Sequence, residues 1–322
     1  MDDRLGMQRA MELAGSVRAT TSPNPWVGAV LSTGHEGATQ PPGGPHAEVV
    51  ALQAAGEAAR GATLYVTLEP CVHHGRTPPC TEAIVAAGVS RVVVGIEDPD
   101  PRVAGRGIAA LRNAGIEVTV GIEEDAVREQ LAPYLKHRRT GRPWVVLKLA
   151  ATLDGRTAAP DGSSKWITGE AARADAHRLR AESDAVLVGA GTVRADDPEL
   201  TVRLDGYDGP QPLRVVLGTV PLEAKVQPAL ELTGDLGAVL DDLGGREIVQ
   251  LLVEGGASVA HAFHAAGLVD RYVVYLAPAL FGGDDARGLF AGPGAPTIDD
   301  VWRGHIVSVD RVGEDLRMEV SP

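Results

Sequence analysis

The chain has 322 residues, of which 44% are hydrophobic and 23% charged, and its formal net charge is −13. This length favours about two domains of ~150 residues, and the composition is ordinary for a globular protein. The acidic charge, without a basic stripe, argues against nucleic acid as a partner, and no apolar run reaches the ~18 residues of a membrane span.

The N-terminus, MDDRLGMQRAMELA, is acidic and has no apolar signal core. The chain contains only two cysteines and therefore no disulfide framework, which favours a reducing compartment. We expect a cytoplasmic protein.

The first half of the chain alternates predicted helices and strands. Apolar residues from Met7 to Val17 recur at helical spacing and predict a first helix. Strands are predicted at 26–31, 63–68, 91–96 and 117–122, and further helices at 46–59, 80–88, 104–114 and 124–137. This alternation predicts an α/β/α sandwich.

Asn24 lies in a Pro-rich loop just before the predicted strand at 26–31. Its side-chain amide could face a site at that strand, and an ordinary turn Asn would explain the residue equally well.

His46, Cys71 and Cys80 offer one imidazole and two thiolates, a ligand set that suits Zn²⁺. Three protein ligands leave a fourth tetrahedral position for water, as in catalytic zinc sites. His46 and Cys80 open predicted helices, and Cys71 follows the strand at 63–68, so the three should converge at one edge of the sheet. A helix N-terminus lowers a thiol pKa, so we expect Cys80 to favour the thiolate.

Glu48 follows His46 by two residues and supplies a carboxylate that can carry protons. The order His-x-Glu, Pro-Cys, Cys resembles the pattern of zinc-dependent deaminases, in which the Glu is not a ligand. The alternative is a structural zinc with His73 or His74 as a fourth ligand, but such a site would not require Glu48. We interpret His73 and His74 as loop or substrate-facing residues.

Two other stretches resemble binding sites, but we do not interpret them as such. The segment from Gly105 to Ala110 mimics a dinucleotide fingerprint, but no strand immediately precedes it. The charged stretch from Lys136 to Pro143 is interpreted as a solvated linker between the domains rather than as a binding patch.

The second half predicts another sheet with helices. Strands are predicted at 144–150, 185–189, 213–217, 248–253, 271–278 and 305–312. Helices are predicted at 169–183, with Thr168 as N-cap, and at 258–267. Glu254, Gly255 and Gly256 form a turn between a strand and a helix, which could admit a phosphate or be a close packing turn.

The two halves together resemble one family over nearly the whole chain. The motifs SPNPWVGAV, GGPHAEVVAL and EPCVHHGRTPPC resemble the cytidine-deaminase-like fold. The motifs KLAATLDGRTA, SSKWITG, VGAGTVRADDPELTVR and LLVEGGA resemble the dihydrofolate-reductase-like α/β fold. In this combination, the chain resembles the bifunctional riboflavin-biosynthesis deaminase-reductases.

The resemblance implies a zinc-dependent pyrimidine deaminase domain at residues 1–141 and an NADPH-dependent reductase domain at 142–322. It implies zinc ligation by His46, Cys71 and Cys80, and proton transfer by Glu48. It implies NADPH contacts by Ala150, Trp166, Thr192, Asp196 and Gly256. It implies substrate contacts by Ser164, Arg180, Leu200, Arg203 and Glu254, with Arg180 and Arg203 as a cationic fork for a phosphate. Lys148 is a weaker candidate for orienting substrate, or a Lys at the edge of the core.

The partners that we expect are a phosphorylated pyrimidine and a second copy of the chain in a homodimer, without nucleic acid or membrane. The region from Gly218 to Arg246 departs from the family by looking abbreviated, which affects part of the expected NADPH pocket. The alternatives are therefore a deaminase whose second domain only binds or dimerises, and a nucleoside or nucleic-acid deaminase.

Overall fold

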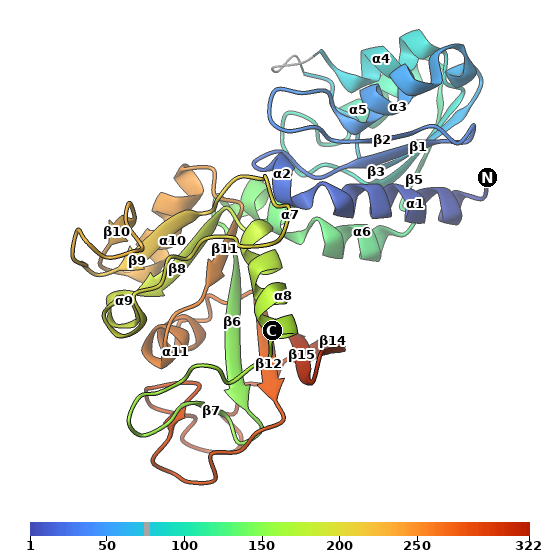
Figure 1. Cartoon of the computed structure of the whole chain (residues 1–322). Helices are drawn as coiled ribbons and strands as arrows, with labels where there is room; N and C mark the ends of the chain where they lie inside the picture. The colour runs from blue at the N-terminus through green and yellow to red at the C-terminus, as the bar shows by residue number, and fades with distance from the viewer. Residues whose placement is uncertain (74–77) are drawn as a thin grey trace. The chain divides into compact units, whose positions relative to one another are not determined.

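The computed structural model describes residues 1–73 and 78–322 and contains two compact units, Met1–Gly141 and Arg142–Pro322 (Figure 1). Helix α7 (Ala132–Thr140) extends almost to the end of the first unit, and Gly141 ends it with a φ of +72°. The expected linker from Lys136 to Pro143 is therefore wrong over residues 136–140, which are helical. Gly141 tolerates this left-handed conformation because it has no Cβ.

The first unit is built on a five-stranded sheet in the order β2-β1-β3-β4-β5. Its strands are β1 (Gly28–Leu31), β2 (Glu36–Ala38), β3 (Thr63–Leu68), β4 (Arg91–Ile96) and β5 (Glu117–Val120). The pairs β3-β4 and β4-β5 are parallel, and β1 is antiparallel to β3. Strands β3 and β4 are buried along nearly their whole length, as expected for parallel strands covered on both faces.

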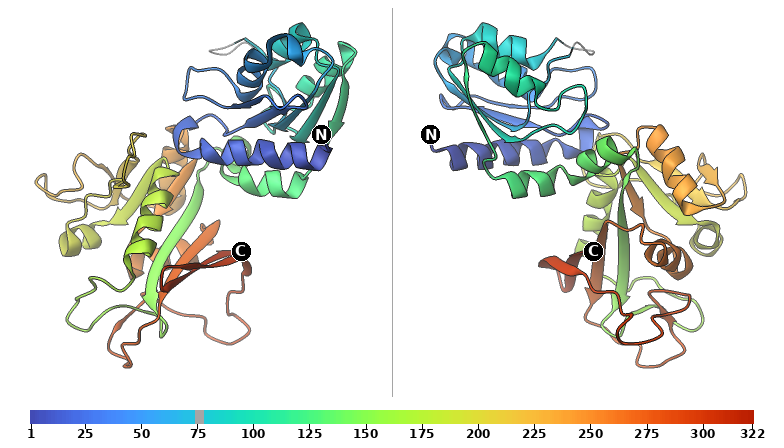
Figure 2. Two further views of the ribbon diagram at one scale, coloured as in Figure 1. Left: turned by 45° about the vertical axis from the view of Figure 1, so that its right-hand side comes forward. Right: turned by 180° about the vertical axis from the view of Figure 1, so that it is seen from behind.

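Helices cover both faces of this sheet. They are α1 (Asp3–Ser16), α2 (Arg18–Thr21), α3 (Ala47–Ala55), α4 (Cys80–Ala87), α5 (Arg106–Asn113), α6 (Glu124–Gln130) and α7, with a 3₁₀ turn η1 (Gly56–Ala59). Helices α3, α4 and α5 lie on one face, and α1 and α6 lie on the other (Figures 1 and 2). The predicted α/β/α sandwich is confirmed, although the expected helix at 124–137 is divided at Leu131, just before Pro133.

The second unit contains an eight-stranded sheet in the order β10-β9-β8-β11-β6-β12-β15-β14. Its strands are β6 (Trp144–Thr152), β8 (Ala185–Gly189), β9 (Leu213–Leu217), β10 (Leu230–Leu232), β11 (Gln250–Val253), β12 (Arg271–Ala277), β14 (His305–Val312) and β15 (Asp315–Ser321). In this order, every neighbouring pair from β10 to β12 is parallel. Strand β15 is antiparallel to β12, and β14 is antiparallel to β15. A separate two-stranded sheet joins β7 (Arg156–Ala158) to β13 (Arg287–Gly288).

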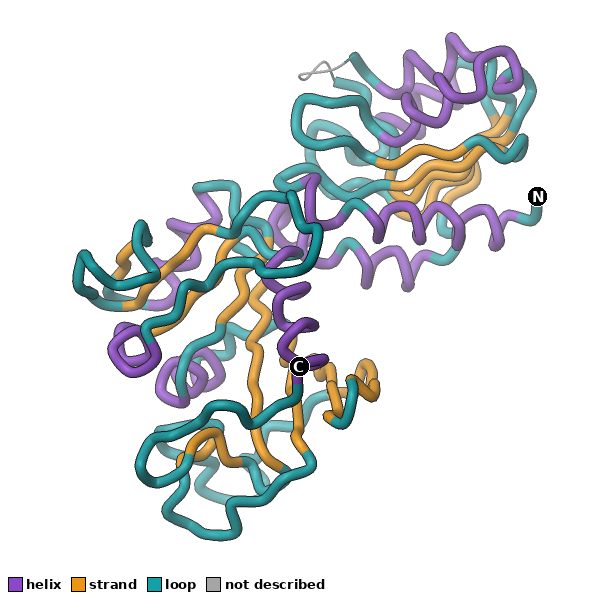
Figure 3. Tube along the Cα trace, in the orientation of Figure 1, coloured by secondary structure: helices purple, strands orange, loops and turns teal. Residues whose placement is uncertain are grey.

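Alternating side chains on the strands of the large sheet form two cores. Along β6, Val145, Leu147 and Leu149 face helices α10 (Leu236–Gly245) and α11 (Ala257–Ala265). On the opposite face, Val146 packs with α8 (Glu170–Ala181) and α9 (Ala190–Asp196). The period of two along a strand places Lys148 and Ala150 on the α8 face. Figure 3 shows the long loops that join these elements.

Three details of the second unit differ from the sequence analysis. Helix α8 begins after Gly169, so Thr168 is not its N-cap; the Gly169 N–H donates to the Asp315 carboxylate over 2.7 Å. Strand β15 was not predicted, although its Leu316, Met318 and Val320 alternate with polar residues. Residues 218–246 include strand β10 and helix α10, so this stretch completes the edge of the sheet and covers one face. Within the described residues, no helix has the length and apolarity needed to cross a bilayer.

Candidate functional site

The predicted zinc ligands come from three places at one edge of the first sheet. His46 is the N-cap residue of α3, Cys80 is the first residue of α4, and Cys71 lies in the loop after β3. The carbonyl of Cys71 accepts hydrogen bonds from both the N–H and the hydroxyl of Thr81, at 3.2 Å each. The first turn of α4 is therefore tied to the loop that carries Cys71.

The three donor atoms lie close enough to share one ion. His46 Nδ1 is 3.2 Å from Cys80 Sγ and 3.7 Å from Cys71 Sγ, and all three donors lie within 4.8 Å of one another. Bond lengths of ~2.0 to 2.3 Å in a tetrahedral zinc site place such donors about 3.5 to 3.8 Å apart. The imidazole and two sulfurs therefore fit zinc in geometry and in chemistry.

The thiols of Cys71 and Cys80 affect each other's acidity. The hydrogen bond from the Cys80 thiol lowers the pKa of Cys71 to about 4, and the same bond and burial raise the pKa of Cys80. Both thiols would bind zinc as thiolates, so the thiolate form of Cys80 stays a prediction. The start of α4 also acts on Cys71, because the backbone N–H of Cys80 donates to Cys71 Sγ over 3.4 Å.

Glu48 lies in the first turn of α3 and its side chain is buried, with 4% of the residue exposed. Burial raises its pKa, and the neighbouring His46 partly opposes this effect. A carboxyl with a raised pKa holds a proton more readily than an exposed one, which suits a group that must both accept and release protons.

A second carboxylate, which the sequence analysis missed, lies just before the Cys71 loop. Glu69 is 3% exposed and accepts four backbone hydrogen bonds. Oε1 accepts from Gly107 (2.8 Å) and Ile108 (3.1 Å), and Oε2 accepts from Gly105 (2.9 Å) and Asp98 (3.2 Å). The start of α5 therefore binds an internal carboxylate, which explains the fingerprint-like glycines. A Cβ on Gly107 would lie 2.1 Å from the carbonyl oxygen of Pro70.

The other candidates of the first unit lie in loops. Asn24 is partly buried between α2 and β1, and its N–H closes a turn to Thr21 O. His73 is not part of the group that could share an ion, as far as the described residues are concerned. His74 lies outside the described residues.

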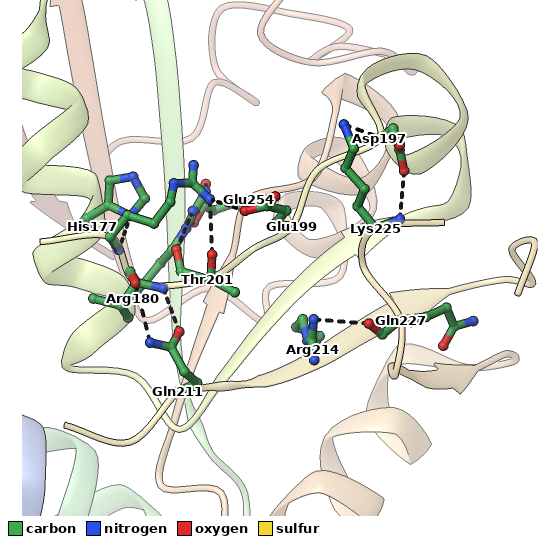
Figure 4. Close-up of polar contacts among 12 residues, drawn as sticks. His177, Arg180, Asp197, Glu199, Thr201, Gln211, Arg214, Lys225, Gln227 and Glu254 are labelled. Carbon is green, nitrogen blue, oxygen red and sulfur yellow. Dashed lines mark hydrogen bonds and ion pairs between the residues drawn. The ribbon is translucent and has the colours of Figure 1, made fainter. Parts of the chain in front are cut away.

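In the second unit, Glu254 and Arg180 form a buried ion pair at the carboxyl end of β11. Arg180 Nε and Nη2 donate to the two oxygens of Glu254 at 2.6 and 2.9 Å, and Nη1 donates to Thr201 O at 3.0 Å (Figure 4). The two side chains are 13% and 9% exposed. Burial alone would raise the pKa of Glu254, but Arg180 and Lys148 bring it below its ordinary value. Arg180 is thus neutralised by a partner within the protein.

The remaining candidates for substrate contact differ in burial and in partners. Lys148 is partly buried, and its Nζ lies 5.9 Å from the ring centroid of Tyr275. Arg203 is exposed, and its Nη1 donates to Glu199 (3.1 Å) and to the Thr201 hydroxyl (3.0 Å). Leu200 adopts a left-handed φ of +56° with its side chain in the core, and Ser164 lies in the loop before α8.

The candidates for NADPH contact lie at the carboxyl ends of the parallel strands β6, β8 and β11, or in the loop before α8. The N–H of Gly256, the N-cap of α11, donates to the Thr192 hydroxyl over 3.1 Å and links the turns after β8 and β11. Asp196 is exposed at the end of α9, and Ala150 lies on β6. Trp166 is 69% exposed, with the Arg173 guanidinium 4.6 Å from its ring centroid.

Comparison with known proteins assigns a family to each part of the chain. Residues 1–96 match the cytidine and deoxycytidylate deaminase zinc-binding region, and residues 143–318 match the RibD C-terminal domain. The chain is 42% identical to the riboflavin biosynthesis protein RibD of Escherichia coli K12 over 361 residues, covering 98% of each. It is 44% identical to the RibD protein of Mycobacterium tuberculosis over 340 residues, covering 99% of this chain and 97% of the relative.

Solved structures agree with these sequence matches. RibD of Acinetobacter baumannii is 43% identical with a TM-score of 0.94, covering 99% of this chain and 98% of that one. A Thermotoga maritima protein described as a diaminohydroxyphosphoribosylaminopyrimidine deaminase and 5-amino-6-(5-phosphoribosylamino)uracil reductase is 35% identical with a TM-score of 0.87, at the same coverage. Since both halves match over nearly their full length, this chain belongs to the RibD family of riboflavin biosynthesis proteins.

Proposed function

We propose that this protein catalyses two successive steps of riboflavin biosynthesis. The first is the zinc-dependent hydrolytic deamination of a phosphoribosylamino diaminopyrimidinone, and the second is the NADPH-dependent reduction of its ribosyl chain to a ribityl chain. The observation that carries this proposal is the group of His46, Cys71 and Cys80 beside the buried Glu48, in a chain that matches the RibD family across both units.

In the deaminase unit, residues 1–141, the imidazole and two thiolates would hold a zinc ion. When bound, zinc would supply Lewis acidity that lowers the pKa of a water molecule to about 7. Glu48 takes one proton from the attacking water and gives it to the ring nitrogen, and then takes the proton of the newly formed hydroxyl and gives it to the departing ammonia. The ring becomes a uracil. Asn24 is assigned to the substrate-facing rim of this unit.

In the reductase unit, residues 142–322, NADPH supplies the hydride for C1 of the opened ribose. We assign the cofactor to Ala150, Trp166, Thr192, Asp196 and Gly256. The protein's task is to orient the cofactor and the substrate and to neutralise the phosphate.

We assign different roles to Arg180 and Arg203, which were expected to bind the phosphate together. Arg180 is bound by Glu254 and serves mainly to hold this carboxylate at the site, with Lys148 nearby. Arg203 is the exposed cation, and we assign the substrate phosphate to it. Leu200, whose side chain is in the core, contributes its backbone, and Ser164 contributes its hydroxyl.

The alternative of a non-catalytic second unit receives no support from residues 218–246. These residues contain β10 and α10 and complete the parallel part of the sheet.

The test is an assay that follows ammonia and NADPH together on the pyrimidine substrate. We expect release of ammonia, followed by NADPH oxidation. The Glu48→Gln variant should keep its zinc and lose ammonia release, yet still oxidise NADPH when given the deaminated intermediate. Glu57→Gln, an exposed carboxylate, is the matched control. Ammonia release by Glu48→Gln at the wild-type rate would exclude the proton-transfer role.

We further propose that the protein acts in the cytoplasm as a homodimer. Both cysteines are free thiols at the zinc site, which suits a reducing compartment, and β14 exposes Ile306 (68%) and Val309 (52%), which suits contact with a second copy. Light scattering on the purified protein tests the dimer, and a monomeric mass would exclude it.

A further inference from the structure

The segment that carries Arg203 has no regular secondary structure, and side chains hold its backbone. Thr201 O accepts from Arg180 Nη1, and the Val202 N–H donates to the side-chain oxygen of Gln211 over 2.7 Å. The Gln211 amide donates back to Val202 O over 3.3 Å. The conformation of this segment therefore depends on these side chains rather than on a strand ladder.

His177 completes this set of contacts. It lies on α8, three residues before Arg180 and hence on the same helix face, and it is partly buried. Its Nδ1 lies 3.2 Å from the backbone N of Arg203. A backbone N–H can only donate, so Nδ1 is the acceptor and the ring carries its proton on Nε2.

The surroundings of His177 keep this acceptor available. Burial lowers the pKa of His177, and the cationic groups of Arg180 and Arg203 lower it further, whereas Glu254 opposes them. The neutral ring is therefore favoured near neutral pH.

We propose that His177 is a positioning residue of the reductase site, whose Nδ1 fixes the backbone of Arg203 and thereby places the Arg203 guanidinium for the substrate phosphate. This inference rests on the proposed function of Arg203. Glu199 and the Thr201 hydroxyl hold the far end of the Arg203 side chain, and His177 holds its main chain. Without the anchor on the main chain, the guanidinium would have to be ordered when substrate binds, which weakens binding.

Two substitutions of His177 distinguish the effect of its hydrogen-bond acceptor from the effect of its side-chain volume. In His177→Asn, the side-chain oxygen can occupy the position of Nδ1 and accept the same hydrogen bond, whereas His177→Leu fills the space without an acceptor. We expect His177→Leu to raise the reductase KM for the phosphorylated substrate about fivefold, the effect of losing one net hydrogen bond, with kcat and the KM for NADPH unchanged. His177→Asn should remain close to wild type. His35→Leu, in the loop before β2 of the first unit, is the matched control.

Amide hydrogen exchange of the peptide that contains residues 200–204 supplies a readout independent of activity. Exchange should be faster in His177→Leu and near wild type in His177→Asn. In addition, His177→Leu should have no further effect on KM in an Arg203→Ala background, because its effect passes through Arg203.

The outcomes separate this inference from the proposed function. An unchanged KM for Arg203→Ala would reject the phosphate role of Arg203 and with it this proposal, even if exchange shows that the hydrogen bond to His177 is present. If Arg203→Ala raises KM but His177→Leu does not, or if His177→Asn is as impaired as His177→Leu, the positioning role of His177 is refuted and the proposed function stands.

Discussion

The buried carboxylate of Glu69 offers the sharpest test of how this fold supports its site. In Glu69→Gln the shape is kept, but one of the two carboxylate oxygens becomes an NH₂ group. Whichever way the amide turns, this NH₂ faces two backbone N–H donors, either Gly107 and Ile108 or Gly105 and Asp98.

The hydrogen bonds of Glu69 determine how far Glu69→Gln should lower the free energy of unfolding. Two hydrogen bonds to a charged acceptor are lost, each worth about 1.5 to 3 kcal/mol, and relief of the buried charge offsets part of this loss. We therefore expect the free energy of unfolding of the first unit to fall by about 3 kcal/mol. With a denaturant slope of about 2 kcal/mol per M, the urea midpoint of that unit falls by about 1.5 M.

The same substitution should weaken metal retention, because Cys71 follows Glu69 by two residues. We expect Glu69→Gln to lose bound zinc at a lower chelator concentration than wild type. Urea unfolding of the purified protein and its zinc content after dialysis are the two measurements, with the exposed Glu57→Gln as control. A urea midpoint within about 0.3 M of that control would show that the four N–H contacts contribute little, and the reasoning would be wrong.

Two further predictions concern pH and metal. Burial raises the pKa of Asp98 from 3.8 to about 6, so the folded state holds this proton more tightly than the unfolded state does. The resulting stability is present below pH ~4 and is lost as the pH rises through ~6, by at most about 3 kcal/mol. Asp98→Asn should therefore gain stability over wild type between pH 4 and pH 7, and a gap in melting temperature that is constant with pH would contradict this. Removal of zinc by a chelator should abolish ammonia release but leave NADPH oxidation of the supplied deaminated intermediate intact, because the three proposed ligands all lie in the first unit. A parallel loss of both activities would contradict that separation.

The sequence predicted well those elements whose signal is local. The strands at 63–68, 91–96 and 213–217 have the predicted bounds because uninterrupted β-branched and aliphatic runs end at polar residues or turns. The convergence of His46, Cys71 and Cys80 was also accessible, since each begins a helix or follows a strand. Strand β15 was missed although both its alternation and its hairpin with the neighbouring β14 are local features.

Properties that depend on tertiary contacts were not accessible from the sequence. The acidities of Cys71 and Cys80 depend on each other, because the hydrogen bond between their thiols lowers the pKa of Cys71 and raises that of Cys80. Arg180 from α8 pairs with Glu254 at the end of β11, and no local sequence pattern predicts this ion pair. Glu69 might have been suspected from its place before Pro70 and Cys71, but its four donors come from other segments.

The three donor atoms belong to three chain segments, which are the start of α3, the loop after β3 and the start of α4. An ion held by His46, Cys71 and Cys80 would act as a cross-link that closes one loop between residues 46 and 71 and another between 71 and 80. Closing loops in this way removes entropy from the unfolded chain, so metal supply and folding yield become coupled quantities. Zinc limitation would then reduce the amount of intact enzyme as well as the turnover of each molecule.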